Sequence, residues 1–109
     1  LPQSLRAIGE FAFEDSMTSI GKISFPDGGD TISLGGNCFA GANSNSNVIL
    51  PHSEINLPSA VDTNGNGLNI YINADAVINA SANSLRNCTL HYNGNDPAAP
   101  WGAANWIHE

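Results

Sequence analysis

The sequence contains an internal repeat, and this repeat constrains the fold more than any other feature. Ile8-Gly9, followed shortly by Ala12-Phe13, returns further along the chain as Leu34-Gly35 followed by Cys38-Phe39. The interval from Ile8 to Leu34 equals the interval from Phe13 to Phe39. Self-similarity at a fixed period of roughly 20–50 residues is typical of solenoids, in which each unit buries its apolar side against the next unit. The sequence therefore predicts a solenoid in which Phe13 stacks on Phe39.

The second half of each unit has the alternation of a β-strand. Ile23 and Phe25 alternate with polar neighbours before Pro26, and this segment returns as 48–51 at nearly the same interval. Proline ends a strand because it has no N–H group to donate. Two more alternating segments follow, so the expected strands end at residues 25, 50, 72 and 92. The expected fold is mainly β, with one short parallel strand in each turn.

An alanine-rich segment, 74–85, interrupts the strands. Asp75 stands early in it and Arg86 follows it, which is the charge order that favours a helix. The sequence therefore predicts one short helix at this place.

The repeat motif resembles the BspA-type leucine-rich repeats of bacterial surface proteins. Their unit reads roughly L-P-x-S-L-x-x-I-G-x-x-A-F, a short turn, and then L-x-x-I-x-I-P. The matching residues are Leu1, Pro2, Ser4, Leu5, Ile8, Gly9, Ala12, Phe13, Ile20, Ile23, Phe25 and Pro26. The second unit keeps the Leu-Gly and Cys-Phe pairs and has an insertion at 27–30. The resemblance implies a leucine-rich-repeat solenoid in a bacterial protein that is secreted or displayed on the cell surface.

The chain of 109 residues is expected to form a single domain. Residues 1–26 and 27–51 are the two clear repeats, and 52–73 and 74–93 are degenerate turns. Residues 94–109 are broken by Gly and Pro and are expected to cap the open end. Two clear repeats followed by two degenerate ones fit the end of a longer array. An uncapped first turn would expose a strand edge, so self-association through the N-terminal edge is also expected.

Charge excludes two classes of partner. The net charge is −7, and the basic residues are Arg6, Lys22 and Arg86. Nucleic acids and anionic membrane surfaces need basic patches, so neither is an expected partner. No apolar run approaches the roughly 18 residues of a membrane span, so membrane insertion is not expected either.

No motif in the sequence requires a metal, a cofactor or catalysis. The segment 62–67 matches the start of a calcium loop, but Asn73 stands where the bidentate Glu belongs, so a tight corner is the preferred interpretation. Cys38 and Cys88 fall on apolar positions and are interpreted as buried thiols, with a disulfide as the less favoured alternative. An enzyme using Cys38 or Cys88 stays open as the weakest hypothesis.

The strands predict a binding face. If Ile23, Phe25 and their equivalents point inward, the residues between them point outward and stack into two rows. The first row is Ser24, Ile49, Tyr71 and His91, and the second row is Lys22, Asn47, Asn69 and Thr89. Exposed aromatic residues with a polar rim are typical of binding sites. We therefore expect binding through Lys22, Ser24, Ile49, Asn69, Tyr71 and His91.

The expected function is non-catalytic binding of a protein ligand on this strand face. The family resemblance implies adhesion to host cells or matrix, from an extracellular or cell-surface location on a bacterium. The alternative is a carbohydrate-binding module in which Tyr71, Trp101 and Trp106 stack on a glycan.

Overall fold

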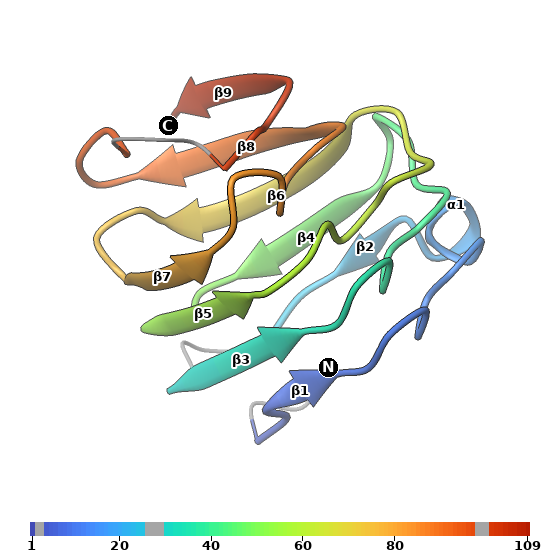
Figure 1. Cartoon of the computed structure of the whole chain (residues 1–109), viewed down its shortest axis with the longest axis horizontal. Coiled ribbons are helices and arrows are strands. Elements are labelled where there is room, and N and C mark those ends of the chain that lie inside the picture. Colours follow the sequence, from blue (N-terminus) through green and yellow to red (C-terminus); the bar gives the residue numbers. More distant parts are fainter. Residues whose placement is uncertain (2–3, 26–29, 98–100) are drawn as a thin grey trace.

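The protein is a β-solenoid of about four turns in a computed structural model that describes residues 1, 4–25, 30–97 and 101–109 (Figure 1). Four parts of the sequence-based expectations lie outside these residues: Pro2 and Pro26 of the repeat motif, most of the insertion at 27–30, and residues 98–100 of the expected cap. The mainly β fold, the stacked parallel strands and the one short helix are confirmed.

Nine short strands and one helix form the solenoid in the described part of the chain. In chain order they are β1 (Ala7–Ile8), α1 (Met17–Ile20), β2 (Lys22–Ile23), β3 (Thr31–Leu34), β4 (Asn47–Leu50), β5 (Glu54–Leu57), β6 (Leu68–Asn73), β7 (Val77–Ala80), β8 (Cys88–Asn93) and β9 (Asn105–His108).

The strands make two parallel sheets that face each other. Sheet A has the order β1-β3-β5-β7, and sheet B has the order β2-β4-β6-β8-β9. In Figure 1 the arrows of the two sheets run in opposite directions, because the chain turns a corner between them. Each turn therefore contributes two strands, and the expectation of one strand per turn was wrong. The additional strands, such as β3 and β5, alternate half-buried and buried residues just as β4 does.

The helix expected over 74–85 is absent. Residues 77–80 are strand β7, which pairs in parallel with β5 from Glu54↔Val77 to Leu57↔Ala80. The β-branched Val77 and Ile78 suit a strand, and pairing with β5 overrides the helix propensity of the surrounding alanines. The short helix is instead α1, which ends at Ile20 and is capped by Gly21, a residue with φ of +78°. Among the described residues, no helix has the length and apolar character needed to span a membrane.

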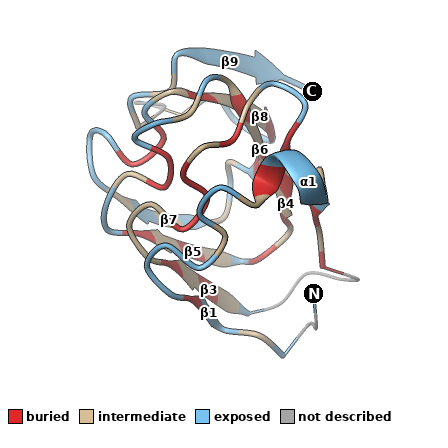
Figure 2. Cartoon of the chain, turned by 90° about the vertical axis from the view of Figure 1, so that its right-hand side faces the viewer, coloured by how far each residue is buried: buried red, intermediate tan, exposed pale blue. Residues whose placement is uncertain are grey.

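The core lies between the two sheets (Figure 2). The expected inward residues of sheet B are all buried: Ile23, Phe25, Val48, Leu50, Ile70, Ile72, Leu90 and Tyr92. Phe13 stacks on Phe39 with ring centroids 6.0 Å apart, as the repeat predicts. Phe39 is fully buried, whereas Phe13 belongs to the first turn and is half-buried. Each layer of the core is thus made of equivalent residues from successive turns.

His52 is a buried polar residue. Its side chain is 1% exposed, neither ring nitrogen has a hydrogen-bond partner among the residues that the structure describes, and its ring meets Phe25 edge-on with centroids 4.6 Å apart. Burial lowers the pKa of His52 below its ordinary value of 6.5, and the positive charge of Arg6 lowers it further.

This burial predicts a loss of stability in mild acid. The unfolded chain takes up a proton on His52 as the pH falls below 6.5, whereas the folded chain resists it, so the free energy of unfolding falls with pH in that range. Urea unfolding at several pH values should show this slope. The free energy of unfolding should depend less on pH in His52→Leu. An unchanged pH dependence in that variant would show that buried His52 is not its cause.

Candidate binding face

The outer face of sheet B carries two rows of side chains, which are the rows that strand alternation predicts to point outward. Register places Ile49, Tyr71, His91 and Ile107 side by side in one row. Ser24 lies half-buried between the buried Ile23 and Phe25. The second row contains Lys22, Asn47, Asn69, Thr89 and Asn105.

An aromatic pair stands at the centre of the first row. The rings of Tyr71 and His91 stack with centroids 4.2 Å apart and an angle of 17° between their planes. Ile49 is the register partner of Tyr71 on the other side. Because the rings stack along the solenoid axis, the face presents ring edges rather than ring faces to a ligand.

Asparagine amides hold this pair in place. The Asn69 amide group donates to the Ser44 carbonyl at 2.8 Å and to the Ser46 carbonyl at 3.3 Å. The Tyr71 hydroxyl donates to Asn47 Oδ1 at 3.5 Å. These bonds between neighbouring turns fix side chains on the surface before any ligand arrives, which lowers the entropy cost of binding.

Both ring nitrogens of His91 are already used. Nδ1 lies 2.7 Å from Glu109 Oε1, and Nε2 lies 2.9 Å from Asn69 Oδ1. A general base needs a free nitrogen within hydrogen-bond reach of the proton it removes. In this arrangement, neither ring nitrogen of His91 is free to accept a proton from a ligand.

A hollow of about 280 Å³ opens between the first row and the ends of the strands. Its lining comes from β4, β6, β8 and the residues that follow β4 and β9: Ile49, Leu50, Pro51, Tyr71, Ile72, Asn73, His91, Tyr92, Asn93 and Glu109. This volume is just below the roughly 300–1,000 Å³ that is typical of small-molecule pockets. It has room for an anchoring side chain of a partner.

The structure brings some predicted residues together and separates others. Ile49, Tyr71 and His91 line the hollow, and Asn69 supports it, whereas Lys22 lies at the first turn, three strands away from β8. Glu109 was missed, because residues 94–109 were expected to be an irregular cap. The cap contains β9, whose residues Asn-Trp-Ile-His at 105–108 do not alternate; the available signal was the strand preference of Trp106 and Ile107.

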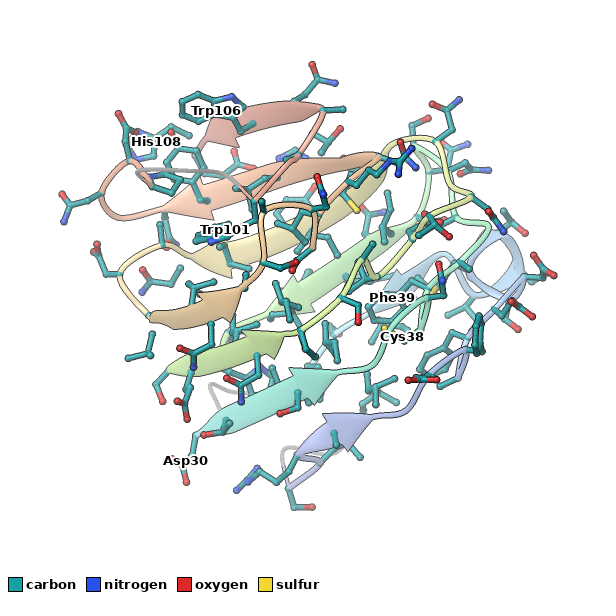
Figure 3. All side chains as sticks on the ribbon, in the orientation of Figure 1. Asp30, Cys38, Phe39, Trp101, Trp106 and His108 are labelled. Atoms are coloured by element: carbon teal, nitrogen blue, oxygen red, sulfur yellow. The ribbon has the colours of Figure 1, made fainter. Side chains whose placement is uncertain are left out.

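The three aromatic residues of the glycan hypothesis do not share a face. Trp106 is the register partner of the buried Leu90, so it points to the opposite side of sheet B from Tyr71. Trp101 packs against the core and lines a different hollow, with Ile78 and Asp96. Figure 3 shows Trp106 at the C-terminal end of the stack and Trp101 below it.

The cysteines show no sign of reactivity. Cys38 and Cys88 are both free and fully buried, and burial raises the pKa of each thiol to about 12. In Figure 3, Cys38 lies beside Phe39 in the interior. A nucleophilic cysteine needs an accessible thiolate, and these positions oppose its formation.

Asp62, the first residue of the calcium-like segment, points into the protein. It is fully buried, and its Oδ1 accepts a hydrogen bond from the Gly41 N–H at 3.1 Å. Burial raises the pKa of Asp62. Its carboxylate thus joins two turns at a corner. No group of three or more His, Cys, Asp or Glu residues suited to a metal occurs in the described part of the chain.

Comparison with known proteins leaves the family open. No family model, curated protein or solved structure matches the chain.

Proposed function

We propose that the outer face of sheet B binds a protein ligand without catalysis. The observation that carries this proposal is the hollow beside the stacked Tyr71–His91 pair, with fixed amides around it. Tyrosine is a favoured anchor of protein interfaces, and a preorganised surface loses little entropy on binding. The His91 nitrogens and the buried cysteines offer no catalytic group.

The ligand class follows from the resemblance to BspA-type repeats. That resemblance supports adhesion to host cells or matrix and an extracellular or cell-surface location. The repeat residues that carry it, such as Phe13 and Phe39, pack in or against the core rather than on the strand face. The outward residues of the strand face differ from turn to turn in this chain, and such a face is where a rigid solenoid presents binding residues.

A glycan ligand is the second candidate, and one observation favours it. Trp106 is 51% exposed, so part of its ring is open to a sugar. Tyr71 is a poorer platform, because His91 stacks on one side of its ring and Ile49 is its neighbour on the other. Glycan binding would therefore depend on Trp106 rather than on Tyr71.

The test compares variants in binding to immobilised matrix proteins, cultured cells and a glycan array. Tyr71→Ala should weaken protein or cell binding by at least about 1 kcal/mol, because an interface anchor is lost. Its melting temperature should barely change, since Tyr71 lies outside the core. Phe11→Ala is the matched control: Phe11 is 51% exposed and lies away from sheet B, so binding should persist.

Two outcomes would contradict the proposal. Equal binding by wild type and Tyr71→Ala would exclude the hollow as the site. Binding to glycans that is lost in Trp106→Ala and kept in Tyr71→Ala would establish the second candidate instead.

A further inference from the structure

Strand β9 is the least buried of the strands that the structure describes. All four of its residues are exposed, whereas each of the other strands in the described ranges has at least one buried or half-buried residue. Within the described part of the chain, it is the outer edge of sheet B and pairs in parallel with β8 alone. Segments with little buried apolar surface open locally at low free-energy cost. The side-chain contacts of β9 therefore decide how firmly it stays in place.

Histidines and carboxylates hold the end of this strand. Glu109, which directly follows β9, contacts His91 of β8 at 2.7 Å, and its N–H donates to the Tyr92 carbonyl at 2.8 Å. His108 stacks on Tyr92 with centroids 4.8 Å apart, and its Nδ1 lies 3.8 Å from Asp96 Oδ1. Figure 3 shows His108 and Trp106 at this end of the stack.

The neighbours of His91 determine how many protons its ring must carry. Asn69 points Oδ1 toward His91 Nε2, because its amide nitrogen donates to two backbone carbonyls. Nε2 must therefore carry a proton to bond with Asn69. Nδ1 faces a carboxylate oxygen of Glu109, so that contact also needs a proton.

Neither neutral form of the ring satisfies both contacts. With a proton on Nε2 alone, Nδ1 and Glu109 Oε1 face each other as two acceptors. With a proton on Nδ1 alone, Asn69 would have to rotate its amide and lose its bonds to Ser44 and Ser46. Only the doubly protonated imidazolium makes every bond in this cluster. Glu109, Tyr71 and Asn69 are the groups that face His91, and Asp96 and Tyr92 are those that face His108.

We propose that residues 105–109 form a pH-dependent strap, which protonated His91 closes and neutral His91 releases. Histidine is the side chain that loses its charge between about pH 5 and 8, so the strap closes in mild acid and loosens in mild base. Opening removes Glu109 from the wall of the hollow and uncovers the edge of β8. An uncovered strand edge can pair with another extended chain.

Amide hydrogen exchange by NMR at about pH 5.5 and about pH 8.5 tests the proposal, after correction for the intrinsic exchange rate. The N–H groups of β9 and Glu109 that bond to β8 should open about tenfold more often in base, because a charge-assisted hydrogen bond is lost. The amides of β4 and β6 serve as an internal reference. The effect of His52 runs in the opposite direction, since that residue weakens the whole fold in acid.

Two variants distinguish the opening of residues 105–109 from a pH-dependent destabilisation of the whole fold. Glu109→Gln should open more at about pH 5.5 and lose most of the pH dependence, because no carboxylate faces His91. Glu54→Gln changes a carboxylate on sheet A and should keep the wild-type response. Nitrogen shifts of the His91 ring should show both nitrogens protonated at the lower pH. Equal protection of β9 at both pH values, or an unchanged response in Glu109→Gln, would overturn the proposal.

Discussion

Replacing Phe39 with alanine should lower the free energy of unfolding by about 3–5 kcal/mol. Phe39 is fully buried in the corner segment between β3 and β4 and stacks on Phe13 of the preceding turn. Alanine would leave a cavity that neighbouring turns cannot fill, because strand pairing fixes their spacing. Urea unfolding followed by circular dichroism measures the change.

The comparison with Phe13→Ala makes this prediction specific. Phe13 has the same place in the repeat, but it lies in the first turn and is only half-buried. Its replacement removes less buried surface, so it should cost clearly less than Phe39→Ala. Equal losses at the two positions, or a loss below about 1 kcal/mol for Phe39→Ala, would mean that the stacked phenylalanines do not hold the turns together.

Gly35→Ala should also destabilise strongly, by about 3 kcal/mol or more, at the upper end of the cost of overpacking. A Cβ atom at Gly35 would lie 2.5 Å from the Glu10 nitrogen and 2.8 Å from the Gly9 carbonyl carbon. Both are backbone atoms of the preceding turn, so no side chain can rotate to make room. The first and second turns would have to separate, and the hydrogen bond from the Gly35 N–H to the Ile8 carbonyl would be strained.

Gly9→Ala is the matched control, because Gly9 is the equivalent glycine of the first repeat. A Cβ atom there meets nothing within 4 Å, so the free energy of unfolding should change by less than about 0.5 kcal/mol. Urea unfolding of the two variants side by side checks both predictions. Similar decreases in the free energy of unfolding for both variants would show that these glycines are needed for the local backbone conformation. They would then not be needed for the close approach of one turn to the next.

Much of the candidate face could be predicted from the sequence alone. Tyr71 and His91 occupy equivalent places in strands whose alternation is unambiguous, so their position in one outward row follows from strand geometry. Their stacking and the hollow beside them could not be predicted. They depend on ring orientations that are set by Asn47 and Asn69, and on Glu109 from the last strand.

The sequence by itself determined the repeat, the inward and outward residues of sheet B, and the stacking of Phe13 on Phe39. These features depend on the local alternation of a strand and on equivalent positions in successive turns. Only the tertiary structure decided that each turn has a second strand, that 77–80 is a strand, and that β9 extends sheet B. The physical reason is that a short parallel strand takes its conformation from a neighbour one turn away. Val77–Ala80 has its partners in β5 of the preceding turn, and an alanine-rich segment read alone favours the helix that those partners prevent.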